Sequence, residues 1–221
     1  MPFNVTANRL LAALPGTALR PLEPHFSPVS VSTGTVVHQV GDEMDHLYFP
    51  TGGMASLQII MRDGRSIDTA AVGREGALGP MAGLGQYKST VRCVVRSTLT
   101  SIKISALEFR RVAVEQPALK TLCFSYVDSL LSQTQINAAR YAFLSIEARL
   151  AVCLSDASNL LASETIPFTQ ETLAEMIAVQ RTSITEAASK LQAAGVITYS
   201  RGMIKILNPS GLLALGRARA N

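Results

Sequence analysis

The chain has 221 residues, a length that suits two modest domains or one domain with a small appendage. Its hydrophobic content of 48% is ample for packed cores, yet no run of about 18 apolar residues occurs, so a membrane-spanning helix is not expected. The net charge of +4 is compatible with a polyanionic partner, although this is a weak argument because many basic proteins bind no polyanion.

The N-terminus and the cysteines bear on location and on metal binding. The opening MPFNVTANRL lacks the basic-then-apolar order of a signal peptide, so we expect a cytoplasmic protein. Cys93, Cys123 and Cys153 are isolated and odd in number, which argues against a disulfide framework and against a zinc site. We therefore expect no metal and read the thiols as buried spectators.

The first half of the chain predicts an antiparallel β domain. Residues 8–14 predict a short helix that ends at Pro15 and Gly16. From Val29 the hydrophobic periodicity changes to two, with glycine turns at 34, 41–42, 52–53 and 63–64. The predicted strands are 29–32, 35–38, 46–49, 54–60, 66–72, 90–95 and 99–104. Short strands separated by such turns indicate a sandwich or barrel.

Helical spacing returns after this β domain. A short helix is predicted over 105–112, and the longest helical pattern of the chain runs from Ala118 to about Tyr141. Its apolar stripe is broad enough for a partner on one side and the β domain on the other. Ser145 can act as N-cap for a further helix over 146–161.

Residues 169–207 begin with two short helices joined by a brief turn, the arrangement of a helix-turn-helix. Thr169 can cap the first helix, in which Leu173, Met176 and Ile177 recur at helical spacing. The second helix has an apolar inner face formed by Ile184, Ala187, Ala188 and Leu191. In such motifs the second helix enters the major groove of DNA.

The outward side of the second helix carries polar side chains suited to nucleic acid. Arg181 can bind guanine O6 and N7 through two hydrogen bonds, and Thr182 and Thr185 offer hydroxyl and methyl groups to base edges. The helix N-terminus, with its free N–H groups, also favours a nearby phosphate. These features predict that the start of this helix contacts DNA.

After Gly195 two strand-like runs, 196–199 and 203–207, flank a Gly-containing turn and predict a hairpin, which makes the motif a winged helix-turn-helix. From Pro167 onward there are six Lys and Arg against three Glu, a net of +3. The wing and this charge weigh against an ordinary helix pair without a DNA function. The residues expected to face DNA are Thr169, Gln180, Arg181, Thr182, Ser183, Thr185, Glu186, Arg201 and Lys205.

The order T-Q-E-x-L-A-x-x-I-A-x-x-R-x-S-I from Thr169 to Ile184, followed by G-V-I and R-G-x-I-x-I, resembles the CRP/FNR family of bacterial transcription regulators. The resemblance covers nearly the whole chain and implies an α+β fold. An N-terminal antiparallel, jelly-roll-like β-roll sensor of the cyclic-nucleotide-binding type would occupy 1–116. A dimerisation helix and hinge would occupy 117–144, and a winged helix-turn-helix DNA-binding domain 145–221.

The resemblance places a guanine-contacting Arg at Arg181, but the neighbouring positions depart from the family pattern. The family often has Glu next and a second Arg four residues after that, where this chain has Thr182 and Glu186. The usual half-site sequence therefore does not transfer. The turn commonly has Gly where this chain has Ala178, and Ala adopts most backbone geometries except those with positive φ.

The resemblance identifies the long helix as a dimerisation helix, paired with its copy as a coiled coil. Packing only within its own chain is the alternative. The residues expected at the dimer interface are Leu119, Leu122, Cys123, Tyr126, Val127, Leu130, Gln133 and Asn137.

In cyclic-nucleotide receptors of this type, a short helix after an F-G-E sequence offers backbone N–H groups to the phosphate, a Glu binds the ribose and an Arg pairs with the phosphate. The loop 72–91 keeps the glycines, but Glu75 is offset in an R-E-G frame. Lys88 stands where the phosphate-binding Arg would fall, and Lys lacks the two-pronged guanidinium. We therefore expect a degenerate pocket that does not respond to cyclic AMP, with no cofactor. The residues expected to line it are Arg74, Glu75, Gly76, Lys88, Ser89 and Thr90.

The sequence thus predicts a homodimeric DNA-binding regulator, with double-stranded DNA, a second copy and RNA polymerase as partners and no membrane. A regulator gated by a cyclic nucleotide or another small effector stays open, as does a ligand-binding β-roll whose helix-turn-helix contacts protein. A haem or gas sensor also stays open, because any of His25, His38 and His46 could be a ligand. No catalytic triad, zinc-protease motif or P-loop is present, so no enzyme is expected.

Overall fold

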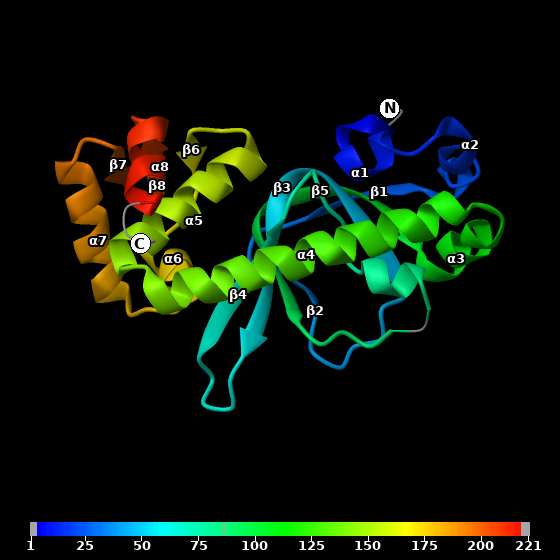
Figure 1. Cartoon of the computed structure of the whole chain (residues 1–221), viewed down its shortest axis with the longest axis horizontal. Helices are drawn as coiled ribbons and strands as arrows, with labels where there is room; N and C mark the ends of the chain where they lie inside the picture. Colours follow the sequence, from blue (N-terminus) through cyan, green and yellow to red (C-terminus); the bar gives the residue numbers. More distant parts are fainter. Residues whose placement is uncertain (1–3, 86, 218–221) are drawn as a thin grey trace. The chain divides into compact units, whose positions relative to one another are not determined.

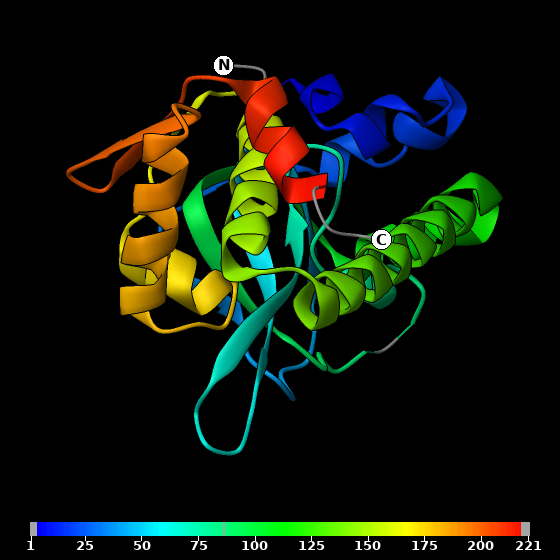
Figure 2. The same ribbon diagram turned by 60° about the vertical axis from the view of Figure 1, so that its left-hand side comes forward.

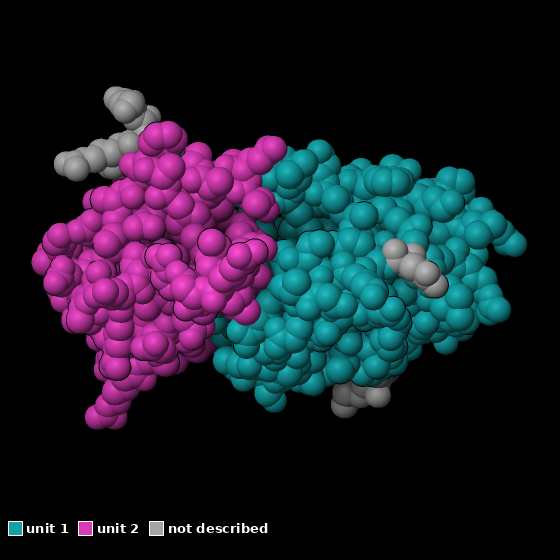
Figure 3. Space-filling model, turned by 90° about the horizontal axis from the view of Figure 1, so that it is seen from below, with its two compact units in different colours: residues 1–57, 70–133 teal, residues 58–69, 134–221 magenta. Residues whose placement is uncertain are grey.

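The computed structural model describes residues 4–85 and 87–217 and divides into two compact units (Figure 3). The first unit comprises residues 1–57 and 70–133, and the second comprises residues 58–69 and 134–221. The tip of one hairpin and the last turns of the longest helix thus belong to the second unit. No helix within the described ranges is long and apolar enough to cross a membrane.

The first unit opens with short helices, interrupted by prolines as expected. They are η1 (Val5–Ala7), α1 (Arg9–Ala12), α2 (Gly16–Leu19) and η2 (Glu23–His25). Asn8 caps α1 by accepting a hydrogen bond from Leu11 N–H, and its buried side-chain amide donates to the carbonyls of Pro50 and Gly76, each at 2.9 Å. One buried side chain therefore joins the N-terminal segment to the β domain.

The β domain of the first unit is built on a sheet with the order β1-β5-β3-β4, in which β2 also pairs with β5 (Figure 1). The strands are β1 (Ser27–Val31), β2 (Val36–His38), β3 (His46–Ile60), β4 (Ser66–Val72) and β5 (Arg92–Ser105). β1 and β2 both pair with β5 in antiparallel fashion. The expected antiparallel β domain is confirmed.

Two predicted chain breaks inside this sheet are wrong. Residues 46–49 and 54–60 form the single strand β3, and 90–95 and 99–104 merge into β5. The glycines at the predicted turn instead allow the backbones of β3 and β5 to lie close together. Gly53 has φ +77°, and a Cβ there would lie 2.0 Å from the carbonyl oxygen of Thr98 on β5. A glycine inside a strand often marks such an approach of another backbone.

Two helices close the first unit. α3 (Ala106–Glu115) starts at its N-cap Ser105, and α4 begins at Pro117 and runs to Phe143, close to the predicted range. α3 places Phe109 beside Phe49 of the sheet, with ring centroids 6.3 Å apart. Leu119, Cys123 and Tyr126 of α4 join this core cluster.

The second unit is the winged helix-turn-helix. Its elements are α5 (Ile146–Leu161), β6 (Thr165–Ile166), α6 (Gln170–Met176), α7 (Arg181–Ala193), β7 (Ile197–Ser200), β8 (Met203–Ile206) and α8 (Pro209–Arg217). Ser145 caps α5 as expected, accepting from Ala148 N–H. The strands form a sheet in the order β6-β8-β7, and α8, which the sequence did not predict, packs along α5 (Figure 2).

Candidate nucleic-acid interface

Both helices of the motif begin where the sequence predicted, and the turn lies between them as expected. Thr169 caps α6, since its hydroxyl oxygen accepts from Thr172 N–H at 3.1 Å. α7 begins at Arg181, after a turn in which Ala178 has φ +53°. This is the left-handed region that alanine was expected to avoid, so the backbone is strained at this residue. The predicted inner-face residues Leu173, Met176, Ile177, Ile184, Ala187, Ala188 and Leu191 are all buried.

The first two turns of α7 present an open, polar surface. Gln180, Arg181, Thr182 and Glu186 are exposed, and Ser183 is half-buried. Gln180 is the N-cap residue, but its side chain makes no capping hydrogen bond. The first N–H groups of the helix are therefore not occupied by a side-chain cap, which suits a phosphate oxygen.

Thr185 is exposed but its hydroxyl is engaged within the protein. It donates to Oε1 of Gln170 at 3.1 Å, with the carbonyl of Arg181 also at 3.2 Å. The proton of this hydroxyl is thus used within the protein, which leaves the hydroxyl oxygen, as an acceptor, and the methyl group to contact a base. Gln170 was missed by the sequence analysis, because its contact joins two helices and has no local pattern.

The wing is a hairpin with a two-residue turn. Arg201 and Gly202 both have positive φ, at +49° and +77°, which matches the turn type that fits the twist of paired strands. Lys205 lies on β8 with its side chain exposed, between buried Ile204 and Ile206. A Cβ on Gly202 would lie 3.6 Å from the methyl group of Thr169, so the wing turn adjoins the start of α6.

The four cations between the start of α6 and the end of β8 fall into two groups, Lys190 in one and Arg181, Arg201 and Lys205 in the other. Lys190 makes an ion pair with Glu147 of α5, and the hydrogen bond from Lys190 lowers the pKa of Glu147 to about 2. In the part of the chain that the structure describes, Arg181, Arg201 and Lys205 have no carboxylate within ion-pairing distance. The three unpaired cations are the ones expected to face DNA.

The last turns of α4 are tied to the helix-turn-helix within the second unit. The hydroxyl of Tyr141 lies 2.8 Å from the carbonyl oxygen of Asp68 and 3.2 Å from that of Met176 at the end of α6. The Arg149 guanidinium lies 5.9 Å from the Tyr141 ring centroid and donates to the carbonyl of Ile177. Burial raises the pKa of Tyr141, so the hydroxyl keeps its proton.

The residues expected in the effector pocket are engaged by their own chain. Glu75 accepts from the N–H of Gly73 at 2.9 Å, and the Arg74 carbonyl accepts from the N–H of Arg9. A Cβ on Gly76 would lie 2.1 Å from the hydroxyl oxygen of Tyr126, so this ring fills the space beside the loop.

The second half of the expected pocket is also committed to local contacts. Lys88 lies 3.9 Å from Glu43, and both side chains are mostly exposed. Ser89 is buried, and its hydroxyl donates to the carbonyl of Val91. The Thr90 hydroxyl lies 3.3 Å from that of Tyr87. These contacts are distinct from those of residues 74–76.

Most residues expected at the dimer interface pack instead on the first unit. Leu119, Cys123 and Tyr126 are at most 7% exposed and lie in its core, and Leu130 packs against it. Gln133 accepts from Ala71 N–H.

Farther along, in the second unit, Asn137 donates to the carbonyl of Thr69 at 3.0 Å. In the part of α4 that belongs to the first unit, Leu122 and Val127 are half-buried, whereas Phe124 and Leu131 are 63% and 55% exposed. The periodicity marked an apolar stripe correctly, but its buried edge covers the sheet.

Two family models match the chain. A cyclic nucleotide-binding domain matches residues 28–113, and a Crp-like helix-turn-helix domain matches residues 148–215. The range between them, 114–147, holds α4. No curated protein sequence matches the chain.

Solved structures share the fold over most of the chain. A regulator from Eubacterium rectale, described as a putative transcriptional regulator of the CRP/FNR family, is 17% identical and has a TM-score of 0.72, covering 96% of this chain and 100% of that chain. The c-di-GMP-responsive regulator CLP of Xanthomonas campestris is 19% identical at a TM-score of 0.71, covering 87% and 99%. A CRP/FNR-family regulator from Thermus thermophilus is 19% identical at 0.71, covering 88% and 100%.

Proposed function

Because the chain belongs to the CRP/FNR family of transcription regulators, we propose that it binds a pseudo-palindromic DNA site as a homodimer and does so without cyclic AMP. The proposal assigns a β-roll sensor to 1–116, a dimerisation helix with hinge to 117–144 and the DNA-binding domain to 145–221. Its partners are DNA, a second copy of the chain and RNA polymerase, in the cytoplasm. No catalytic role is proposed.

The observation that carries DNA binding is the unpaired Arg181 at the open start of α7. An unpaired guanidinium can bind guanine O6 and N7 through two bonds, and the Glu186 carboxylate, exposed on the same helix, can accept from the amino group of cytosine. Arg201 and Lys205 on the wing supply phosphate contacts, which position the protein without reading sequence. In this proposal the side chains of α7 contact the bases, and those of the wing contact the phosphates.

A homodimer is supported by the outward face of α4. Phe124 and Leu131 are exposed and stand one heptad apart, so they lie on the same side of the helix. A solvent-facing apolar stripe on so long a helix is stabilised when a copy covers it. Two-fold symmetry then presents two copies of α7 to half-sites one helical turn, about 34 Å, apart.

Independence from cyclic AMP is supported by the loop contacts. Glu75, which would have to bind a ribose, already accepts a backbone hydrogen bond, and Tyr126 fills the space beside Gly76. Lys88 offers a point charge where a two-pronged guanidinium would grip a phosphate. A nucleotide would have to displace contacts that the chain makes with itself.

The proposal is tested by fluorescence anisotropy of labelled promoter fragments, titrated with the purified protein at fixed salt with and without cyclic AMP and cyclic GMP. We expect sequence-selective binding that neither nucleotide changes. Replacing Arg181→Ala should weaken binding to the selected site by about 1–3 kcal/mol and relax the preference at one base position in each half-site.

Arg201→Asn is the matched control, because Asn tolerates positive φ and keeps the wing turn while removing one cation. It should weaken binding to selected and scrambled DNA alike. Equal weakening of both DNAs by Arg181→Ala would show that Arg181 is a phosphate anchor. Binding that appears only with a cyclic nucleotide would contradict the pocket assignment and favour an effector-gated regulator.

A further inference from the structure

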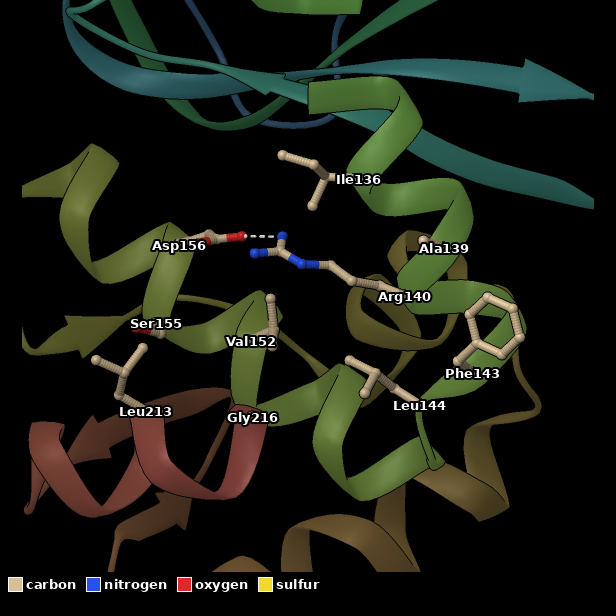
Figure 4. A pocket seen from close by; sticks show the side chains of 10 residues that line it. All are labelled: Ile136, Ala139, Arg140, Phe143, Leu144, Val152, Ser155, Asp156, Leu213 and Gly216. Atoms are coloured by element: carbon tan, nitrogen blue, oxygen red, sulfur yellow. Dashed lines mark hydrogen bonds and ion pairs between the residues drawn. The ribbon is translucent and has the colours of Figure 1, made fainter. Parts of the chain in front are cut away.

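A cavity of about 460 Å³ lies in the second unit, between the last turns of α4, the middle of α5 and α8 (Figure 4). Its volume is in the range of small-molecule sites. Its lining comprises Ile136, Ala139, Arg140, Phe143, Leu144, Val152, Ser155, Asp156, Leu213 and Gly216. The walls are therefore mostly apolar, with one cation and one carboxylate.

The Arg140 guanidinium reaches across this cavity toward Asp156 (Figure 4). Its Nη1 atom donates to Asp156 Oδ2 and to Asn137 Oδ1, both at 3.0 Å. Among the described residues, no hydrogen-bond partner is found for Nε or Nη2 of Arg140. Two donors in the geometry that suits a carboxylate are thus open beside an apolar wall.

The apolar wall is exposed where a ligand would enter. Phe143, Ile136 and Leu213 are 78%, 53% and 40% exposed. The floor depends on Gly216, where a Cβ would lie 2.8 Å from the Val152 side chain, so a glycine lets α8 approach α5. These exposed apolar side chains lie around Arg140, a cation with open hydrogen-bond donors. The combination suits a ligand that has an apolar body and an anionic head.

The proposed dimer does not account for this exposure. At about 100° per residue, Ile136 and Phe143 lie about 120–140° around α4 from Leu131, and so face a different direction from the stripe proposed to pair with a copy. None of the lining residues is among those proposed to face DNA. The cavity is thus separate from both surfaces that the proposed function uses.

We propose that this cavity binds a small hydrophobic carboxylic acid, whose carboxylate accepts from Nε and Nη2 of Arg140 and whose apolar body lies against Phe143 and Leu213. The acid shares Arg140 with Asp156, the one fixed carboxylate of the lining. Asp156 therefore competes for the guanidinium and repels the incoming anion. Removing the charge of Asp156 and removing that of Arg140 have opposite effects on binding.

The test is isothermal titration calorimetry of the full chain with hexanoate, 4-phenylbutyrate and decanoate, and with the amide of each as the neutral control. We expect saturable binding of at least one acid, with its amide about 10-fold weaker or more, because a charge-assisted hydrogen bond is lost. Arg140→Gln should lower the affinity for the acid by about 10-fold and leave the affinity for the amide nearly unchanged.

Asp156→Asn is the matched variant with the opposite expectation. It should bind the acid several-fold more tightly, and it should fold normally because burial already raises the pKa of Asp156 and disfavours its charge. Thermal melting of both variants checks folding. Equal affinity for acid and amide, tighter binding by Arg140→Gln, or no saturable binding of any of the three acids up to about 1 mM would each overturn the proposal.

Discussion

Ala178 lies in the turn between α6 and α7 at φ +53°, a conformation in which its Cβ crowds the backbone. Glycine would remove a strain of about 1–2 kcal/mol, while adding freedom to the unfolded chain worth about 0.5–1 kcal/mol. We therefore expect Ala178→Gly to raise the free energy of unfolding by about 1 kcal/mol or less, measured by urea denaturation.

Ala194→Gly is the control for this substitution, since Ala194 ends α7 at φ −75°, where alanine is unstrained. There glycine should only add freedom to the unfolded chain and lower stability. If Ala178→Gly also lowered stability by a similar amount, the left-handed alanine would carry no strain.

The ion pair between Lys190 and Glu147 predicts that the stability of the protein against unfolding depends on pH. Its hydrogen bond lowers the pKa of Glu147 from 4.5 to about 2, so folding favours the ionised carboxylate. The stabilisation is present in full above about pH 4.5 and is lost as the pH falls toward 2. We expect wild type to be more stable than Lys190→Met at pH 6, by a difference that shrinks below about pH 4.5 and is lost as the pH falls through about 2.

This prediction is checked by chemical denaturation of both proteins across that range. Glu147→Gln should lose the same pH-dependent stabilisation relative to wild type as Lys190→Met, since either change deletes the ion pair. A difference between wild type and Lys190→Met that stayed constant from pH 6 to 2 would show that Lys190 acts by packing rather than by its charge.

At the scale of elements, α4 predicts how the protein assembles. Leu131 is 55% exposed on the stripe proposed to pair with a second copy, so Leu131→Asp would place two like charges at the seam. We expect this variant to raise the dimer dissociation constant at least about 10-fold, measured by sedimentation equilibrium. Val114→Asp, at a 74% exposed position of α3, is the control and should leave the dimer intact. An unchanged dimer in Leu131→Asp would place the interface elsewhere.

The elements show which signals a sequence carries and which it does not. Thr169 and Ser145 were identified as caps because a capping side chain acts on N–H groups two or three residues away. The break expected at Gly52 and Gly53 was wrong, since a glycine marks either a turn or a close approach, and only the position of β5 distinguishes them. Periodicity likewise found the apolar stripe of α4 without telling which edge the sheet covers.

At the scale of the whole molecule, the family fold and the exposed Arg181 followed from local patterns, whereas contacts between distant segments did not. Gln170 fixes the hydroxyl of Thr185 across two helices, and Arg140 meets Asp156 across a cavity. α8 was missed as well, although Pro209 at its first position is a helix start signal. Such contacts depend on how elements pack, which no single stretch of sequence encodes.

Tyr141 gives one of these distant contacts a further meaning. Its hydroxyl has a single proton and faces two acceptors, the carbonyls of Asp68 at 2.8 Å and of Met176 at 3.2 Å. One proton cannot form two bonds of full strength, so a shift that shortens either contact weakens the other. The carbonyl of Asp68, in the hairpin of β3 and β4, and the carbonyl of Met176, at the end of α6, therefore compete for the same hydrogen.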